Sequence, residues 1–468
     1  MTTSTNQSYS MYSRIGSMLN LRLEQSRRHV ESNRESIVLV QLEISSDEST
    51  KISQKNHHIC LVIDCSGSME DDGKMDEAKN DAISLVRGLP SDHMVSIVAF
   101  DDDVHVILDP KPASERQYIE NMIDSIEVGS ATAMHAGISK AFDLVEQNRS
   151  LSSSNTINRL VVITDGLPTA GPCEDEDFIQ QAKEIRNSGV TTSTVGIGAD
   201  YDEELLKKVA EFGGGRWEHV SNTNNLSTVM NEQATQMQNT IITNPQLRIT
   251  LLDTAKLIEA NTARPNTGPI DNLQESGNVI HIGLKDIVKN EPHALVFKIK
   301  IPAGNGENLP LLTAEIFEGS NIVAGPETLE ITYTLDRDLC SAENKSPFNS
   351  FMATRHTILR EREIHGDPDA GKEADTILKI LPNPELEDGL AKDTIIHANK
   401  IAGKISPDLT ESEKKELSHQ TTMIDTMVEK LDEAIDDLKN PEAKEDDPGE
   451  PEFFKEKDKK KLDEGEEE

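Results

Sequence analysis

The first half of the chain alternates between two hydrophobic patterns. Short, continuous apolar runs predict buried strands at 59–64, 95–100, 160–164, 191–197 and 216–220. Apolar residues at helical spacing predict helices at 74–89, 115–126, 135–147, 177–188, 202–212 and 225–237. The run 104–108 follows the second strand after a short turn, which predicts an antiparallel edge strand. This order predicts an α/β fold, in which a doubly wound, mainly parallel sheet is covered by helices on both faces.

The hydrophobic period changes near residue 245. Alternating apolar and polar residues, separated by Gly, Asn and Pro turns, predict strands at 247–252, 279–284, 294–301, 311–317 and 329–335. An all-β segment of this kind is typical of a sandwich. Two earlier strand-like runs, 19–24 and 37–44, have no local pairing partner. We therefore expect them to complete the sandwich, so that the α/β domain is inserted into a discontinuous β-sandwich.

With 468 residues, the chain is too long for a single core. The patterns predict helices again beyond residue 346, while the last segment is dominated by acidic side chains and reads as disordered. The expected organisation is a disordered N-terminus at 1–17, a β-sandwich at 18–50 and 245–337, an α/β domain at 55–238, a helical C-terminal region at 346–438 and a disordered acidic tail at 441–468.

Charge and composition indicate which partners and which cellular compartment to expect for this protein. Acidic residues number 84 against 47 basic ones, giving a formal net charge of -37, so nucleic acid is a poor partner. The four cysteines show no CxxC spacing, which indicates a reducing compartment. The polar first ten residues contain no apolar signal region, and no window approaches 18 apolar residues. We therefore expect a cytoplasmic protein without an integral membrane segment; the sequence leaves its oligomeric state open.

The strongest chemical signal follows the strand at 59–64. The string Asp64-Cys65-Ser66-Gly67-Ser68 places a carboxylate and two hydroxyls where a buried strand gives way to a helix. All three are hard oxygen ligands, which small divalent cations such as Mg²⁺ prefer. Taken alone, Asp64 could cap the following helix, and the two serines could be ordinary turn residues. A metal held by these three side chains would be under-coordinated, so further ligands must come from other strand ends.

Two other segments fall in the right topological place. Thr132 lies in the loop just before the helix at 135–147, and Asp165 ends the strand at 160–164. In doubly wound sheets, the carboxyl ends of neighbouring strands meet at the edge where ligands bind. Asp165 is followed by a glycine, so an Asp-Gly turn is the alternative for this residue alone. Its combination with Thr132 and the Asp64 string predicts a divalent-metal site.

This set resembles the metal-ion-dependent adhesion site of the von Willebrand factor type A family, whose fold is Rossmann-like. The resemblance rests on Asp-x-Ser-x-Ser, a threonine about 65 residues later, and Thr-Asp-Gly after a buried strand. The wider layout is loosely similar to bacterial and archaeal calcium-activated chloride channel homologues and to inter-alpha-trypsin inhibitor heavy chains. The resemblance implies five metal positions: Asp64, Ser66, Ser68, Thr132 and Asp165.

In that family the two serines bind the ion directly, the threonine or the aspartates can bind it through water, and one position is left for a carboxylate of a partner protein. The resemblance therefore implies a protein-interaction module that uses Mg²⁺, with Mn²⁺ or Ca²⁺ as alternatives, and a partner presenting Asp or Glu. An adaptor for an AAA-type ATPase and a structural role for the metal are alternatives. A metal-assisted hydrolase is a weaker one, because the string offers no base or nucleophile, and we expect no enzyme.

Overall fold

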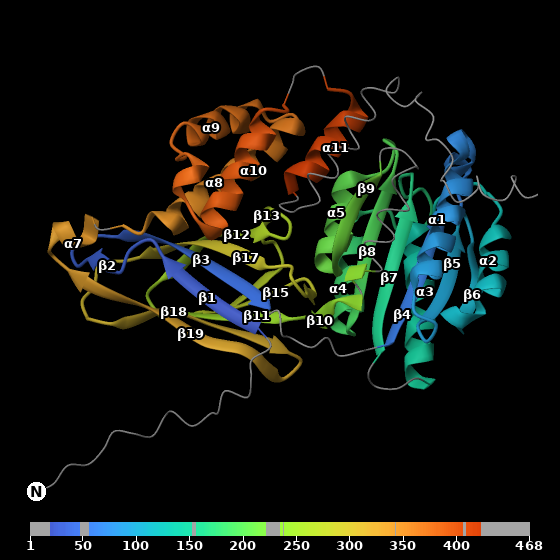
Figure 1. Cartoon of the computed structure of the whole chain (residues 1–468), viewed down its shortest axis with the longest axis horizontal. Coiled ribbons are helices and arrows are strands. Elements are labelled where there is room, and N and C mark those ends of the chain that lie inside the picture. The colour runs from blue at the N-terminus through green and yellow to red at the C-terminus, as the bar shows by residue number, and fades with distance from the viewer. Residues whose placement is uncertain are drawn as a thin grey trace, which may run out of the picture. The chain divides into compact units, whose positions relative to one another are not determined.

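The protein is represented by a computed structural model that describes residues 19–46, 56–151, 156–220, 235–236, 238–341, 343–405 and 409–422 (Figure 1). Several predictions from the sequence lie outside these residues. They are the disordered segment 1–17, most of the helix 225–237, the end of the helical region at 423–438 and the tail 441–468.

The α/β domain is built on a six-stranded sheet of order β6-β5-β4-β7-β8-β9. Five strands are parallel, while β6 pairs with β5 in the antiparallel sense, as the short turn after residue 100 predicts. Along the chain the strands are β4 (Asn56–Asp64), β5 (Met94–Phe100), β6 (Val104–Pro112), β7 (Thr156–Thr164), β8 (Val190–Ile197) and β9 (Gly214–Val220). Connections leave β4 in one direction and return to β7 on its other side, so the topological switch point lies between these two strands.

Helices cover both faces of this sheet (Figure 1). They are α1 (Lys74–Gly88), α2 (Arg116–Asp124), α3 (Met134–Leu151), α4 (Asp175–Asn187) and α5 (Glu203–Phe212). Alternate residues of β4 enter different cores: Leu61 and Ile63 pack with α1 and α2, whereas Cys60 and Val62 pack with α3, α4 and α5. A strand buried on both faces must be apolar throughout, which explains the continuous runs in the sequence.

The β-sandwich consists of two sheets of order β1-β3-β17-β12-β13 and β14-β15-β11-β18-β19-β2. The first sheet contains β1 (Leu19–Gln25), β3 (Ser36–Ser46), β12 (Lys256–Arg264), β13 (Gly268–Pro269) and β17 (His293–Ile301). The second contains β2 (His29–Glu31), β11 (Gln246–Leu251), β14 (Leu273–Ser276), β15 (Val279–Gly283), β18 (Leu309–Glu318) and β19 (Asn321–Thr334). A short separate pair joins β10 (Thr240–Ile242) to β16 (Ile287–Val288).

The register between β3 and β17 shows how the insertion works. These two strands are antiparallel neighbours, with Val40 opposite Phe297, although the whole α/β domain lies between them in the sequence. Val40 and Phe297 are both buried in the sandwich core. The predicted fold class, an α/β sheet inserted in a β-sandwich and followed by helices, is therefore confirmed.

The C-terminal helices pack on both sheets of the sandwich, on β9 of the α/β domain and on each other. They are α7 (Arg337–Ser341), α8 (Lys345–Ile364), α9 (Pro368–Leu378), α10 (Gly389–Ala402) and α11 (Glu411–Thr422). Phe351 of α8 and Leu390 of α10 share a small core with Leu39 and Val296 from β3 and β17. Across the described parts of the chain, no helix is both long and apolar enough to cross a membrane.

Candidate metal-binding site

Four of the five predicted metal positions lie at or just after the carboxyl ends of the neighbouring strands β4 and β7, and the fifth lies in the loop between α2 and α3. Asp64 is the last residue of β4, and Asp165 comes directly after β7, the strand paired in parallel with β4. Ser66 and Ser68 lie at the start of the 3-10 helix η1 (Gly67–Gly73), and Thr132 lies two residues before α3. This is the edge and the switch point at which doubly wound sheets bind ligands.

Backbone hydrogen bonds tie the three loops of this edge together. The loop after β4 is held to the loop before α3, because Gly67 N donates to Ser130 O at 3.1 Å and Gly129 N donates to Cys65 O at 2.7 Å. Thr132 is tied in turn to the loop after β7. Its backbone N donates to Thr169 Oγ1 at 2.9 Å, and its carbonyl accepts from Thr169 N at 3.0 Å. The loops that carry the candidate ligands are therefore held in place, which limits how far they must rearrange when a metal binds.

The side-chain oxygens are spaced as metal ligands would be. Ser66 Oγ and Ser68 Oγ are 3.2 Å apart, and Ser68 Oγ lies 2.7 Å from Asp165 Oδ1. Neighbouring oxygens of an octahedral Mg²⁺ site with bonds of about 2.1 Å are separated by about 3 Å. A methyl group on Gly166 would lie 3.5 Å from Ser68 Oγ and 3.9 Å from Thr132 Oγ1, so both hydroxyls face the same space. The residues present therefore fit a small, hard divalent cation.

Two carboxylates are buried at this edge. Asp64 accepts hydrogen bonds from Ser66 N at 2.8 Å and from Thr164 Oγ1 at 2.5 Å. Burial nevertheless raises the pKa of Asp64 to about 6. The charge of Asp165 also raises this pKa, whereas the hydrogen bonds from Thr164 and Ser66 lower it. The folded protein thus keeps a carboxylate where its charged form is poorly solvated. A cation at this edge would stabilise that form.

Cys65, which lies between Asp64 and Ser66 in the motif, is not placed as a metal ligand. The Cys65 side chain is buried in the core formed with α1 and α2. Burial, together with the charges of Asp101, Asp64 and Asp102, raises the pKa of its thiol to about 12. Because only a thiolate binds metals well, Cys65 does not turn the edge into a site for soft metals.

The structure adds two residues that sequence reasoning did not assign to the site. Thr164 holds Asp64 through its hydroxyl, and Lys74 Nζ donates to Asp165 Oδ2 at 2.7 Å. Thr164 could have been noticed, because it belongs to the Thr-Asp-Gly string. The contact of Lys74 depends on how α1 begins, and no sequence pattern indicates it. In the described residues no group of three or more His, Cys, Asp or Glu could hold a metal, so binding at this edge depends on hydroxyls.

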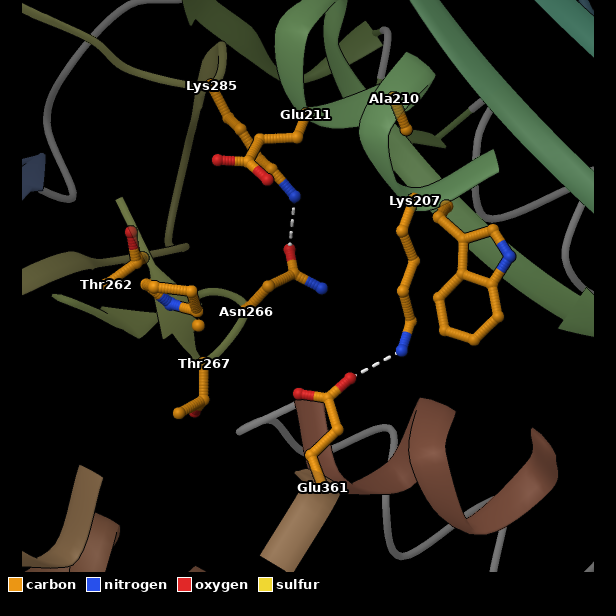
Figure 2. A pocket seen from close by; sticks show the side chains of 11 residues that line it. Lys207, Ala210, Glu211, Thr262, Asn266, Thr267, Lys285 and Glu361 are labelled. Atoms are coloured by element: carbon orange, nitrogen blue, oxygen red, sulfur yellow. Dashed lines mark hydrogen bonds and ion pairs between the residues drawn. The ribbon is translucent and has the colours of Figure 1, made fainter. Parts of the chain in front are cut away.

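A second candidate is a pocket of about 160 Å³ lined by residues of α5, β12, β13 and α8 (Figure 2). Its charged side chains have partners within the protein. Lys285 Nζ donates to Asn266 Oδ1 at 2.8 Å, and Lys207 Nζ donates to Glu361 Oε1 at 2.5 Å. Ligand pockets usually measure about 300–1,000 Å³ and are mostly apolar. We interpret this smaller, charged pocket as part of the junction between the α/β domain, the sandwich and the helices.

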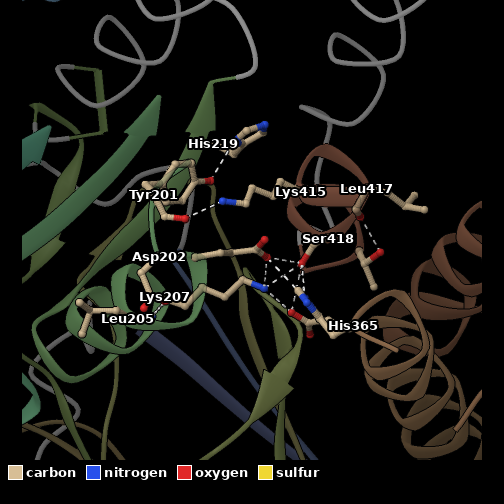
Figure 3. A network of polar contacts seen from close by, with 12 residues as sticks. Tyr201, Asp202, Leu205, Lys207, His219, His365, Lys415, Leu417 and Ser418 are labelled. Carbon is tan, nitrogen blue, oxygen red and sulfur yellow. Dashed lines mark hydrogen bonds and ion pairs between the residues drawn. The ribbon is translucent and has the colours of Figure 1, made fainter. Parts of the chain in front are cut away.

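A third feature is the polar contact between α11 and the α/β domain (Figure 3). We call it the α11 cluster; it comprises Tyr201, Glu203, Lys207, Glu218, Glu361, His365, Lys415, Ser418 and His419. His419 Nε2 and Glu218 Oε2 form a buried ion pair at 3.0 Å. Ser418 Oγ donates to Glu203 Oε1 at 2.6 Å, and Lys415 Nζ donates to Tyr201 O at 2.6 Å. These contacts hold α11 against β9, an edge strand of the sheet, and against the start of α5.

The α11 cluster gives this contact a pH dependence. Burial alone lowers the pKa of His419, but the hydrogen bond and charge of Glu218, with the charge of Glu416, raise it above its ordinary value. A group whose pKa is raised on folding stabilises the fold fully below its unfolded pKa, about 6.5 for histidine, and loses that effect as pH rises through the folded pKa. We expect the stability difference between the wild type and His419→Gln to shrink between pH 6 and pH 9. Urea unfolding at both pH values measures it, and a difference that grows with pH would contradict this assignment.

Comparison with known proteins supports the fold of the α/β domain. The family model described as von Willebrand factor type A domain matches residues 58–233. The solved structure of a von Willebrand factor type A protein from Catenulispora acidiphila aligns with a TM-score of 0.68 at 16% identity, covering 87% of this chain and 98% of that one. The ArnB paralog VWA2 from Sulfolobus acidocaldarius aligns with a TM-score of 0.55 at 19% identity, covering 86% and 97%.

Sequence relatives match over the same part of the chain. The uncharacterized protein YfbK of Escherichia coli is 28% identical over 185 residues, which are 39% of this chain and 32% of YfbK. Inter-alpha-trypsin inhibitor heavy chain H2 of Mus musculus is 21% identical over 194 residues, 40% of this chain and 20% of that protein. The chain thus spans about a third or less of the length of these two relatives. Residues 58–233 match the von Willebrand factor type A domain, and the two solved structures support this fold for the α/β domain.

Proposed function

We propose that this protein is a divalent-metal-dependent protein-interaction module. Its metal would be held by Asp64, Ser66, Ser68, Thr132 and Asp165, and its partner would present an Asp or Glu side chain. Von Willebrand factor type A domains commonly mediate protein–protein interactions. The observation that carries the proposal is the spacing of the serine and aspartate oxygens, 2.7 to 3.2 Å, at one edge of the sheet.

The donor set explains why such a site would bind a carboxylate. Three of the five ligands are neutral hydroxyls, so only the two carboxylates offset the charge of a divalent ion, and a hard cation with an open coordination position still accepts a further anionic oxygen. When bound there, the cation would supply an electrophilic centre with an open position for a partner's carboxylate. The five side chains would hold and orient this centre, because backbone hydrogen bonds join the three loops that carry them. Mg²⁺ suits the hard oxygen donors, and Mn²⁺ and Ca²⁺ are the alternatives.

We propose a binding role and not a catalytic one. A metal-assisted hydrolase needs a base or a nucleophile beside the ion. All five side chains of the set are used as ligands or as supports for ligands, which leaves no such pair among them. An AAA-type ATPase is one class of partner that the proposal accommodates, and identifying the captured protein tests this adaptor hypothesis directly.

The test is capture of partners by the immobilised full chain in Mg²⁺ and in EDTA. We expect a partner that is retained by the wild type in Mg²⁺ and lost at least about tenfold both in EDTA and with Asp165→Ala, because the metal bridges the two proteins. Asp143→Asn, an exposed change on α3, serves as the charge-matched control and should bind like the wild type.

The partner, once identified, is then purified and its acidic surface residues are replaced one at a time. A single substitution that removes the metal-dependent part of the affinity would identify the bridging carboxylate. Partner binding that is indifferent to EDTA and to Asp165→Ala would contradict the proposed function.

A further inference from the structure

Lys74 reaches into the candidate metal site from the first turn of α1. Its Nζ donates to Asp165 Oδ2 at 2.7 Å, and its side chain is 13% exposed against 0% for Asp165. The other oxygen of the same carboxylate, Oδ1, accepts from Ser68 Oγ. Asp165 is therefore shared between a candidate metal ligand on one side and an ammonium group on the other.

The local backbone places Lys74 in this position. Gly73 precedes it with a φ of 72°, a left-handed conformation that turns the chain from η1 into α1. Further out, the Lys74 side chain runs past the loop after β8, where a methyl group on Gly198 would lie 3.8 Å from its Cε. The stem of the side chain thus lies between that loop and the site, and its charge is directed at Asp165.

Lys74 and a divalent cation would compete for the same carboxylate, that of Asp165. Asp64 and Asp165 are two buried carboxylates, and Lys74 contributes one positive charge in direct contact with Asp165. A divalent cation bound to the same carboxylate would lie close to the ammonium group, and like charges repel strongly where water is largely excluded. Metal binding must either displace Lys74 from Asp165 or tolerate this repulsion. Both lower the apparent affinity for the metal.

We propose that Lys74 is an internal counter-cation that neutralises Asp165 when no metal is bound and gives up this carboxylate when a divalent ion enters. Lys74 thereby weakens the affinity of the site for metal and keeps the metal-free site ordered. This inference rests on the proposed function, because it assumes that the edge binds a divalent ion. It adds a positioning residue that lies outside the five predicted ligands.

The test compares Lys74→Met with Lys79→Met on the full chain. Methionine keeps an unbranched apolar stem without the charge, and Lys79 is the control on the same helix, with its Nζ donating to Asp124 O. Mn²⁺ affinity is measured by titration calorimetry in a chelator-free buffer. We expect Lys74→Met to bind Mn²⁺ about tenfold more tightly than the wild type or more. Lys79→Met should stay within about twofold of the wild type, because its charge is not at the site.

Each outcome has a separate meaning. If the wild type binds Mn²⁺ and Lys74→Met binds it with the same or a weaker affinity, the inference is overturned while the proposed function stays intact. Absence of Mn²⁺ binding by both proteins would overturn both. If Lys74→Met does not fold, wild-type crystals soaked in Mn²⁺ decide the question. A bound ion beside an intact Lys74–Asp165 contact contradicts the inference, and withdrawal of Nζ from Asp165 supports it.

Discussion

Replacing Asp64 by Asn is expected to lower the affinity for Mg²⁺ or Mn²⁺ about a hundredfold or more. The change removes one of two carboxylates from the candidate site, and the affinity of hard cations follows the charge of their ligands. The side chain keeps its size, and its amide oxygen can still accept from Ser66 N, so the loop after β4 should keep its conformation. Titration calorimetry with the full chain gives the affinity directly, with Asp143→Asn as the charge-matched control.

The same variant carries an internal check on folding. Because burial raises the pKa of Asp64 to about 6, the ionised carboxylate is less stable in the folded chain than in the unfolded one at neutral pH. This cost is present above the folded pKa and disappears as pH falls through the unfolded value of about 3.9. Asp64→Asn should therefore be at least as stable as the wild type at pH 7 in EDTA. Wild-type metal affinity in a folded Asp64→Asn protein would rule out Asp64 as a ligand.

Replacing Glu218 by Ala is expected to destabilise the protein by about 3 kcal/mol or more. The substitution leaves His419 buried without the carboxylate that contacts it at 3.0 Å, and breaking one side of a buried ion pair typically costs 3–5 kcal/mol. The effect should centre on α11, which is held to β9 by this pair. Trp217 is the only tryptophan of the chain, and its ring centroid lies 5.2 Å from that of His419. Its fluorescence therefore reports α11 during urea unfolding.

Two control variants test whether the destabilisation by Glu218→Ala comes from the buried ion pair with His419. Glu218→Gln keeps the shape of the side chain and an accepting oxygen, so it should cost less than the alanine. Glu315→Ala breaks a more exposed ion pair with Arg248 on the sandwich and should cost under about 1 kcal/mol. Hydrogen exchange should show faster exchange in α11 for Glu218→Ala alone. Equal losses in Glu218→Ala and Glu315→Ala would show that the pair does not anchor α11.

The sequence predicted those features whose residues follow a strict local pattern. Asp64 and Asp165 could be placed at one sheet edge because each ends a continuous apolar run, and parallel strands bring such ends together. Strand β12 was missed because its apolar residues are interrupted by polar ones at Lys256, Glu259 and Asn261, so no clear alternation emerges. The insertion of one domain in another could be inferred, since two early strands lacked any local partner.

Contacts between distant segments could not be predicted in this way. From the sequence, only helical structure could be predicted for the region of α11, and the part of that region beyond residue 422 lies outside the described residues. Leu417 packs with Ile364 of α8 and Ile401 of α10. By contrast, α11 contacts the α/β domain through the polar side chains of Lys415, Ser418 and His419. Polar pairs leave no periodic signal, because their partners lie about 200 residues away. The contact of Lys74 with Asp165 was hidden for the same reason.

The most direct test of the metal site is an anomalous difference map from crystals of the full chain soaked in Mn²⁺. The account predicts one strong peak bounded by the hydroxyls of Ser66, Ser68 and Thr132 and the carboxylates of Asp64 and Asp165, and no such peak in Asp64→Asn. A map without density at this edge, or with Mn²⁺ held there by other side chains, would contradict it.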